Sequence, residues 1–507
     1  MYETVLILSV VIFAVTTALF LRQPSASMLH PTTFYLMFHG IVFVVRPVFA
    51  WYYGYGGLMY RAMHFTPTLQ DKVEALICAN LALVAFVAVS LLLIREPLVF
   101  MQNSFDINQR SQLMKRFLVV ALLFGAIAAY STYWVLDYSQ SGEAFSDIDY
   151  RTGARAMRAT NGYFFAAGLM LASIVAIIAF LGRFTLWSMA PFVVFALYRF
   201  ATGQRGAVVT AAVMMALLYM YDRRKKWPTL AVVLAALVIA PVFNSIRSDR
   251  GAGLRESIGY ELAEGDVRQT TPQEEEEAPL ETMDLGMMEM VEFVTWSIPE
   301  KSGSYDYFLG NLQIFTEPIP RALWPEKPIG QPIKLFDMYS HAVTINGVMS
   351  VPGMGWVYWG YPGVVIWAAV FALIYGSGYK AFARGSQSNL AVIGYVIFLS
   401  TAVISYRDGL LLTVLKQNLF FMTPFLALVL VCRMTSLPTA ANLRQLWESR
   451  ALRPENAPSS PSVHRRVAAD QERAEASHPD GALISGPRER RRARALQASK
   501  GNETSPA

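Results

Sequence analysis

Three arginines in the first half of the chain, Arg151, Arg155 and Arg158, are spaced so that a helix would place them all on one face. Like charges stacked in this way repel one another unless a bound anion or facing carboxylates balance them. Acidic side chains do occur nearby, at Glu143, Asp147 and Asp149. The spacing therefore leaves two interpretations open, an anion-binding site or a local network of salt bridges.

Two further groups of arginines follow along the chain. Arg199 and Arg205 are joined by a short segment that contains Gly203, and glycine allows a tight turn and close approach of the backbone to a ligand. Because the connection is so short, we expect the two guanidinium groups to lie together. This favours an anion-binding role over snorkelling of two interfacial side chains. The third group consists of Arg247, Arg250 and Arg255.

Two cations, Arg46 and Lys416, lie inside stretches that are otherwise apolar. A charge at such a position is costly in a membrane and usually faces a bundle interior or a water-filled cavity. Each either belongs to a functional site or is paired with a buried acid that the sequence does not identify. Arg407 and Asp408, adjacent before the last apolar stretch, are either a functional base and acid or a polar hairpin.

The composition excludes an ordinary soluble domain. Of 507 residues, 54% are hydrophobic and 16% are charged, and the mean hydropathy is +0.35. Since a helix needs about 20 mostly apolar residues to cross a bilayer, we predict an all-α polytopic membrane helix bundle with about eleven spans. They lie near 4–21, 33–51, 73–94, 117–136, 162–181, 185–199, 206–221, 228–245, 354–375, 389–405 and 410–432.

The distribution of basic residues predicts the orientation, because the strongest clusters should stay cytoplasmic. These clusters are Arg95 with Arg110, Lys115 and Arg116, then Arg223 to Lys226, then Lys380 with Arg384. The N-terminus is then outside and the C-terminus inside. The three arginine groups fall on the outer face, where cations are unusual, and a bound anion at the membrane surface would explain them.

Two regions lie outside the predicted bundle. Residues 246–353 form one long outer loop, and within it the apolar, proline-rich stretch from Phe315 to Lys334 suggests an ordered surface lying on the bilayer. We therefore predict a membrane-embedded domain over 1–435, including this loop. Residues 436–507 are predicted to be a disordered, basic cytoplasmic tail. Nothing in the tail resembles a nucleic-acid-binding module.

Cysteine and histidine give no sign of a metal site. Cys78 and Cys432 both fall inside predicted spans, and the histidines are scattered without ligand spacing. We therefore expect no disulfide on the outer face and no cofactor.

Three short motifs carry a resemblance to a known family. They are Thr202-Gly203-Gln204-Arg205-Gly206, the glycine-rich segment from Gly353 to Gly363, and Ile319-Pro320-Arg321-Ala322-Leu323-Trp324-Pro325-Glu326-Lys327-Pro328. The chain resembles bacterial oligosaccharide repeat-unit polymerases, the O-antigen polymerase (Wzy-like) family, from about 150 to 410. The family commonly has Glu after the glycine that opens the late motif, whereas this chain has Met354.

The resemblance implies a multi-span glycosyltransferase of the bacterial inner membrane. It would join repeat units carried on undecaprenyl diphosphate at the periplasmic face and so build a surface polysaccharide. The other partners it implies are inner-membrane lipid and a regulator of chain length. Arginines suit this chemistry because they can neutralise the departing diphosphate without a metal ion.

On this hypothesis Arg155, Arg205 and Asp249 are catalytic, while other basic residues bind substrate: Arg46, Arg151, Arg158, Arg199, Arg247, Arg250, Arg321, Lys327 and Arg407. Asp147, Asp149, Glu317 and Asp408 remain alternative bases for the acceptor hydroxyl. Two other functions stay open. One is an O-antigen ligase, which transfers a finished glycan from the same carrier. The other is a transporter or flippase of anionic lipid-linked sugars.

Overall fold

The computed structural model describes residues 1–55, 60, 65–98, 100, 106–140, 166–201, 206–230, 234, 280, 285–319, 323–324, 326–328, 330–336, 348–385 and 388–435. All of them belong to the first of two units of the chain, Met1–Ala441. These residues form helices and connecting loops and contain no β-strand. The predicted tail, 436–507, lies outside the described residues.

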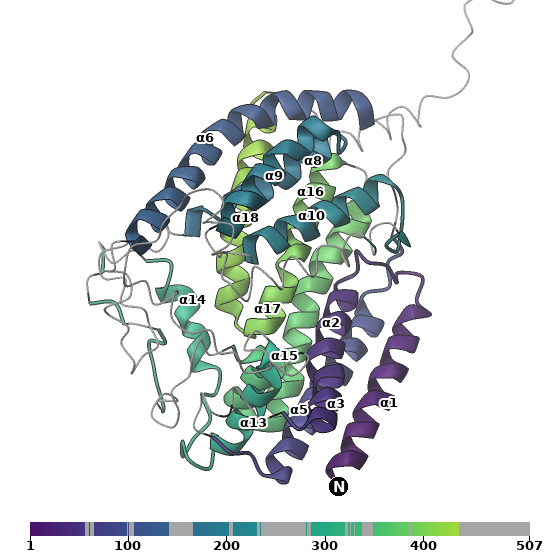
Figure 1. Ribbon diagram of the computed structural model, residues 1–507, viewed down its shortest axis with the longest axis vertical. Coiled ribbons are helices and arrows are strands. Elements are labelled where there is room, and N and C mark those ends of the chain that lie inside the picture. Colours follow the sequence, from purple (N-terminus) through teal and green to yellow (C-terminus); the bar gives the residue numbers. More distant parts are fainter. Residues whose placement is uncertain are drawn as a thin grey trace, which may run out of the picture. The chain divides into compact units, whose positions relative to one another are not determined.

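The N-terminal part contributes two apolar helical stretches (Figure 1). Helix α1 spans Tyr2–Leu21, and α2 (Pro31–His39), the π-helical turn η1 (Gly40–Val45) and α3 (Arg46–Tyr53) follow as one continuous helical run. The His30 side chain caps α2 by accepting a hydrogen bond from the Thr32 amide, and Pro31 occupies the first helical turn, where its missing N–H costs nothing. Gly54 ends α3 in the left-handed conformation.

Helix α5 (Leu69–Leu93) begins with a complete capping box. The Asp71 carboxylate accepts from the Thr68 amide at 2.7 Å, and the Thr68 hydroxyl accepts from the Asp71 amide at 3.2 Å. The helix packs against α1 and against α15 (Ser350–Gly385). Its start is therefore well defined at one end of the bundle.

Between α5 and residue 222, the described residues form four more helices: α6 (Asp106–Gln140), α8 (Met170–Leu181), α9 (Leu186–Ala201) and α10 (Gly206–Asp222). Helix α8 packs against the other three. Arg110, at the start of α6, joins three of them, because it forms an ion pair with Asp222 at 2.7 Å and donates to the Phe180 carbonyl at 3.3 Å.

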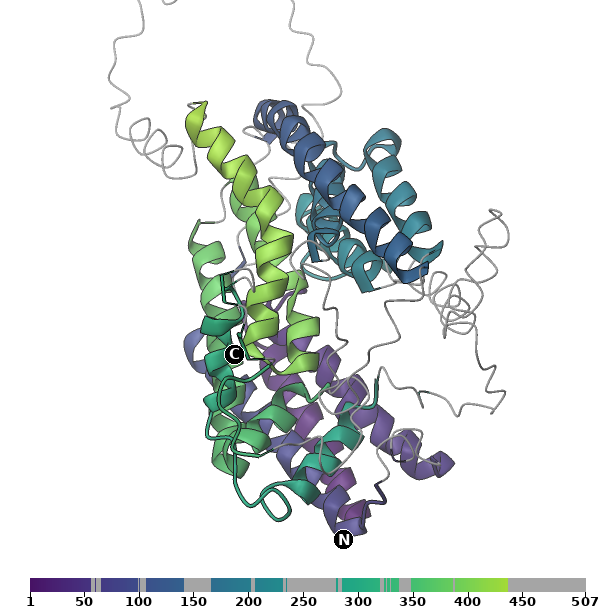
Figure 2. The same cartoon turned by 90° about the vertical axis from the view of Figure 1, so that its left-hand side faces the viewer.

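The C-terminal part of the bundle consists of α15, α16 (Asn389–Ser400), α17 (Ala402–Asp408) and α18 (Leu411–Met434). Helices α16 and α18 pack together and are drawn in green and yellow-green in Figure 2. Within the predicted outer loop, the described residues before α15 form three short helices: α13 (Met287–Ser297), η5 (Leu309–Leu312) and α14 (Gln313–Thr316).

Helix α15 is broken at Trp359 and Gly360, where the backbone leaves the helical conformation. Gly360 has φ +58°, and a Cβ atom there would lie 2.9 Å from the Tyr305 hydroxyl. The break frees carbonyl groups, and the loop satisfies them: the Asp306 and Tyr307 amides donate to the Val357 and Tyr358 carbonyls, each at 2.9 Å. The predicted span near 354–375 therefore lies within a longer helix, which starts at Ser350 and contains this break.

Seven helices among the described residues are long and apolar enough to cross a membrane, and three shorter apolar helices accompany them. The prediction of a helical membrane protein is therefore confirmed. The ten helices lie at ten of the predicted spans, while most of the remaining one, 228–245, lies outside the described residues. Cys78 and Cys432 are buried and free, as expected.

Segments predicted to be cytoplasmic contact one another. Glu96 forms ion pairs with Lys380 and Arg384, at 3.7 and 3.2 Å. The Lys226 ammonium donates to the Pro24 carbonyl at 3.3 Å. Together with the Arg110 contacts, these bonds join helix ends that the positive-inside rule assigns to the same face.

Candidate functional site

A pocket of about 610 Å³ lies between segments that are all predicted to be at the outer face. It is formed by the start of α1, the second half of the α2–α3 run, the connection to α5, the first turn of α5, and α13. The residues that line it are Met1, Tyr2, Glu3, Arg46, Pro47, Ala50, Trp51, Gly54, Tyr55, Tyr60, Leu69, Lys72, Met288, Glu289 and Glu292. Polar and charged groups thus gather where the apolar helices end.

Arg46 is fully buried and forms an ion pair with Glu289 of α13. Its Nε atom donates to the Leu280 carbonyl at 3.2 Å, and its guanidinium group lies 5.9 Å from the centre of the Tyr55 ring. Arg46 directly follows the π-helical turn η1, and such turns often occur at functional sites. The sequence left the partner of Arg46 open, and the structure identifies it as Glu289.

A second acid, Glu292, lies one turn further along α13 and is also buried. It accepts a hydrogen bond from the Tyr60 hydroxyl at 2.6 Å. Burial raises the pKa of the Glu292 carboxyl from 4.5 to about 8, and the Glu289 charge adds to the rise. The Tyr60 hydrogen bond and the charges of Lys72 and Arg46 act in the opposite direction. A carboxyl with this pKa can both accept and donate a proton near neutral pH.

Lys72 adds a further cation to the pocket. Its ammonium group lies 5.4 Å from the centre of the Tyr60 ring, and it acts on the charge of Glu292. Trp51, in α3, is about half exposed and supplies a flat apolar surface. The pocket therefore combines two cations, two buried acids and aromatic rings, a set that suits a polar ligand with anionic and hydroxyl groups.

Arg199 occupies a different place. It is buried, and its Nη2 atom donates to the Gly168 carbonyl at 2.8 Å and to the Thr132 hydroxyl at 3.4 Å. These contacts join α9 to α6 and to the turn before α8. Arg199 does not line the pocket around Arg46.

Lys327 and Lys416 share one acid, Glu317. Lys416 donates to Glu317 Oε1 at 2.5 Å, and the Lys327 ammonium lies 3.5 Å from Glu317 Oε2. Burial alone would raise the pKa of Glu317, but the Lys416 hydrogen bond and charge and the Lys327 charge hold it below its usual value. Glu317 is thus kept ionised, which makes it a poor base, and the acid that pairs with Lys416 is identified.

Arg407 and Asp408 form the end of α17. The Asp408 carboxylate accepts a hydrogen bond from the Thr413 hydroxyl at 2.9 Å, which ties it to the first turn of α18. Neither residue lines the pocket around Arg46. These contacts fit the interpretation of a polar hairpin.

The remaining predicted site residues lie outside the described residues: Arg151, Arg155, Arg158, Arg205, Arg247, Asp249, Arg250 and Arg321, with the alternative bases Asp147 and Asp149. Arg46 is the one member of the predicted set that lines the pocket among the described residues.

Sequence reasoning missed Glu289 and Glu292, and a signal for them exists. Both acids interrupt the apolar run Met287-Met288-Glu289-Met290-Val291-Glu292-Phe293-Val294 and are three residues apart. Such spacing places both carboxyls on one helix face.

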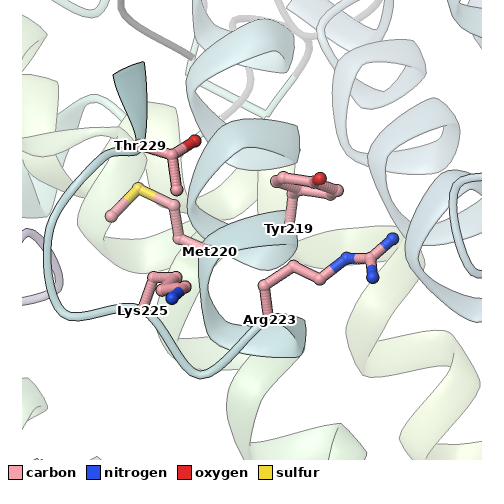
Figure 3. Close-up of a pocket in the computed structure, with 5 residues that line it drawn as sticks. All are labelled: Tyr219, Met220, Arg223, Lys225 and Thr229. Atoms are coloured by element: carbon pink, nitrogen blue, oxygen red, sulfur yellow. The ribbon is translucent and has the colours of Figure 1, made fainter. Parts of the chain in front are cut away.

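A smaller pocket of about 300 Å³ lies at the C-terminal end of helix α10, on the predicted cytoplasmic side. Figure 3 shows its lining, Tyr219, Met220, Arg223, Lys225 and Thr229, with the Arg223 guanidinium group extending away from Lys225. Arg223 lies against the Tyr219 ring, 5.4 Å from its centre. No acid is found among the described residues that line this pocket, so these residues offer cations without a carboxylate.

Comparison of the chain with models of protein families, with curated proteins and with solved structures found no match. The fold and the pocket therefore define a class, a helical membrane protein with a polar pocket where its helices end.

Proposed function

We propose that this protein is a glycosyltransferase that polymerises undecaprenyl-diphosphate-linked oligosaccharide repeat units into a surface polysaccharide. It acts at the periplasmic face of the bacterial inner membrane. In this proposal the chain has eleven spans, a periplasmic N-terminus, a cytoplasmic C-terminus and a periplasmic loop over 246–353. The motifs around Arg205, Arg321 and Gly353 support the family. The contacts among the predicted cytoplasmic segments support their lying on one face, and the distribution of basic residues supports the choice of that face.

One observation carries the proposal: the pocket that holds Arg46, Lys72 and Glu292 lies between segments assigned to the outer face. A lipid-linked diphosphate sugar presents its anionic group at the membrane surface and its sugar just beyond. Cations close to the ends of apolar helices suit the first part, and acids with aromatic rings suit the second.

The reaction needs two kinds of group. The acceptor hydroxyl oxygen bonds to the anomeric carbon of the donor sugar while the bond from that carbon to the diphosphate oxygen breaks. The diphosphate leaves on its carrier lipid with the bonding electron pair, and the hydroxyl proton passes to a base. Arg155 and Arg205 bind the departing diphosphate in this proposal, and no metal ion takes part.

We assign the base to Glu292 rather than Asp249. Its raised pKa makes its ionised form a stronger proton acceptor than an ordinary carboxylate, and its position in the pocket places it beside the cations. The pair Glu289 and Arg46 positions it, because both acids project from α13.

The test is deletion of the gene followed by separation of the surface polysaccharide on a gel. Single repeat units on the carrier lipid are the expected result. Complete polymer stranded on the carrier would instead indicate a ligase, and repeat units retained on the cytoplasmic face would indicate a flippase. Complementation with Glu292→Gln or with Asp249→Asn then distinguishes the two candidate bases, because only the former should fail to restore polymer.

A further inference from the structure

The part of the outer loop around α14 exposes an unusual amount of apolar surface. Among the described residues from 311 to 336 none is buried. Phe315 is 74% exposed and Leu323 is 79% exposed, and Leu312, Ile319, Trp324, Ile333 and Leu335 are exposed as well. Water around such a cluster is unfavourable, so this surface needs a covering partner.

An ion pair anchors this segment and fixes its position along helix α18. Glu317, directly after α14, accepts from Lys416 of α18 at 2.5 Å. The Lys327 ammonium donates to the carbonyls of Glu317 and Ile319, at 2.9 and 3.2 Å, and so closes the segment on itself. Helices α14 and α18 are in contact.

Lys416 lies five residues after Leu411, the first residue of the membrane helix α18. At the rise of an α-helix this is about 7.5 Å from the helix end. Amphipathic segments at a membrane surface bury their apolar side chains about 5–10 Å into the boundary between lipid headgroups and acyl chains, a range that includes this distance. The anchor thus holds the exposed apolar side chains at the level of this boundary.

The helix to which this segment is anchored also exposes apolar side chains. Leu419, one turn after Lys416 on α18, is 47% exposed, and Leu426 and Leu430 further along are exposed too. A membrane span that leaves leucines uncovered in this way faces lipid. The segment is anchored to the outer end of that same helix.

We propose that the described residues between 312 and 335 form a membrane-interface segment, which inserts Phe315, Leu323 and Trp324 into the outer leaflet and is held there by Lys416 and Glu317. The partner is the bilayer surface itself. Tryptophan at such a level is typical of interfacial anchoring. This inference does not depend on glycosyl transfer and stands or falls separately from it.

Site-directed spin labelling of the full-length protein in phospholipid vesicles tests the proposal. Because Cys78 and Cys432 are buried, a single introduced cysteine can be labelled selectively, with the unsubstituted protein as the blank. Labels at Phe315→Cys and Leu323→Cys should be more accessible to oxygen, which concentrates in lipid, than to a water-soluble nickel chelate. The matched control is Glu300→Cys, an exposed polar position of the same loop. A label there should be more accessible to the chelate than to oxygen.

Chelate access at Phe315 and Leu323 equal to that at Glu300 would overturn the proposal, since the segment would then face water. Low access to both reagents would overturn it too, because another protein surface or a second copy of the chain would then cover the segment. The anchor has its own test. Adding Lys416→Gln to the Phe315→Cys protein should raise the access of the chelate to the label. Unchanged access would refute the anchoring role of Lys416.

Discussion

Gly363 and Gly355 lie backbone against backbone on the two sides of the break in α15. A Cβ atom on Gly363 would come within 2.2 Å of the Gly355 carbonyl oxygen, and one on Gly355 would lie 2.6 Å from Val364 Cα. No flexible side chain is available to move away, because both neighbours are backbone atoms. This contact explains why the late glycine-rich motif contains glycine at these positions.

Gly363→Ala should therefore destabilise the protein by about 1–3 kcal/mol, the usual cost of overpacking. Thermal unfolding in detergent measures the loss. Gly125→Ala is the matched control: Gly125 lies inside α6, and a Cβ atom there meets nothing within 4 Å. That control should be neutral or stabilising by up to about 1 kcal/mol, because alanine is the better helix former. Equal effects of the two substitutions would contradict the close approach.

Removing one partner of the ion pair between Arg46 and Glu289 should destabilise the protein far more than replacing both partners with apolar residues. Arg46→Met alone leaves a buried carboxylate without its partner, for which we expect a loss of about 3–5 kcal/mol, whereas Arg46→Met with Glu289→Met should recover much of it. Protein abundance in the membrane and thermal stability give the readout. Arg384→Ala, which breaks a pair in which Arg384 is 66% exposed, should cost less than about 1 kcal/mol. Additive effects of the two methionine substitutions would argue against a coupled pair.

The sequence predicted the membrane class and the positions of ten described helices, because runs of about 20 apolar residues are a strong local signal. It also identified Arg46 and Lys416 as cations within apolar stretches that need partners. It could not name Glu289 or Glu317, since each pair joins positions far apart in the chain and nothing local records such a contact. The break at Gly360 was missed for the same reason: it depends on Tyr305 and the loop that packs there.

The raised pKa of Glu292 predicts a definite pH dependence of stability. The folded pKa is about 8 against an unfolded value of 4.5, so the folded state holds a proton that the unfolded state releases between these values. The contribution of this group to the free energy of unfolding is fully present below about pH 4.5 and is lost as the pH rises to about 8. The free energy of unfolding should fall by at most about 1.4 kcal/mol per pH unit in this range. Thermal unfolding across this range should show the fall. Glu292→Gln should flatten it, and an equally steep fall in that variant would assign the effect elsewhere.

The orientation can be checked with reporter fusions. A reporter placed after Gly142 should be periplasmic and one placed after Arg224 cytoplasmic, because the basic clusters assign these loops to opposite faces. Activity of an alkaline phosphatase reporter at the first position and of a cytoplasmic fluorescent reporter at the second is the expected pattern. Should both positions report the same side, the topology and the functional proposal that rests on it would fail together.

The last prediction concerns the leaving diphosphate. If Arg155 and Arg205 neutralise it, the purified protein should extend a lipid-linked repeat unit in the presence of excess chelator, because guanidinium groups then supply the positive charge that a divalent ion supplies elsewhere.

The matched measurement compares Arg205→Lys with Arg205→Ala under the same conditions. A lysine keeps the charge but cannot make a bidentate contact, so it should retain only part of the activity, while alanine should lose a contact worth about 1.5–3 kcal/mol. Activity that disappears with chelator and returns with magnesium or manganese would reject the arginine mechanism. It would direct attention to Asp147, Asp149 and Asp249, whose carboxylates are the kind of ligand that such an ion prefers.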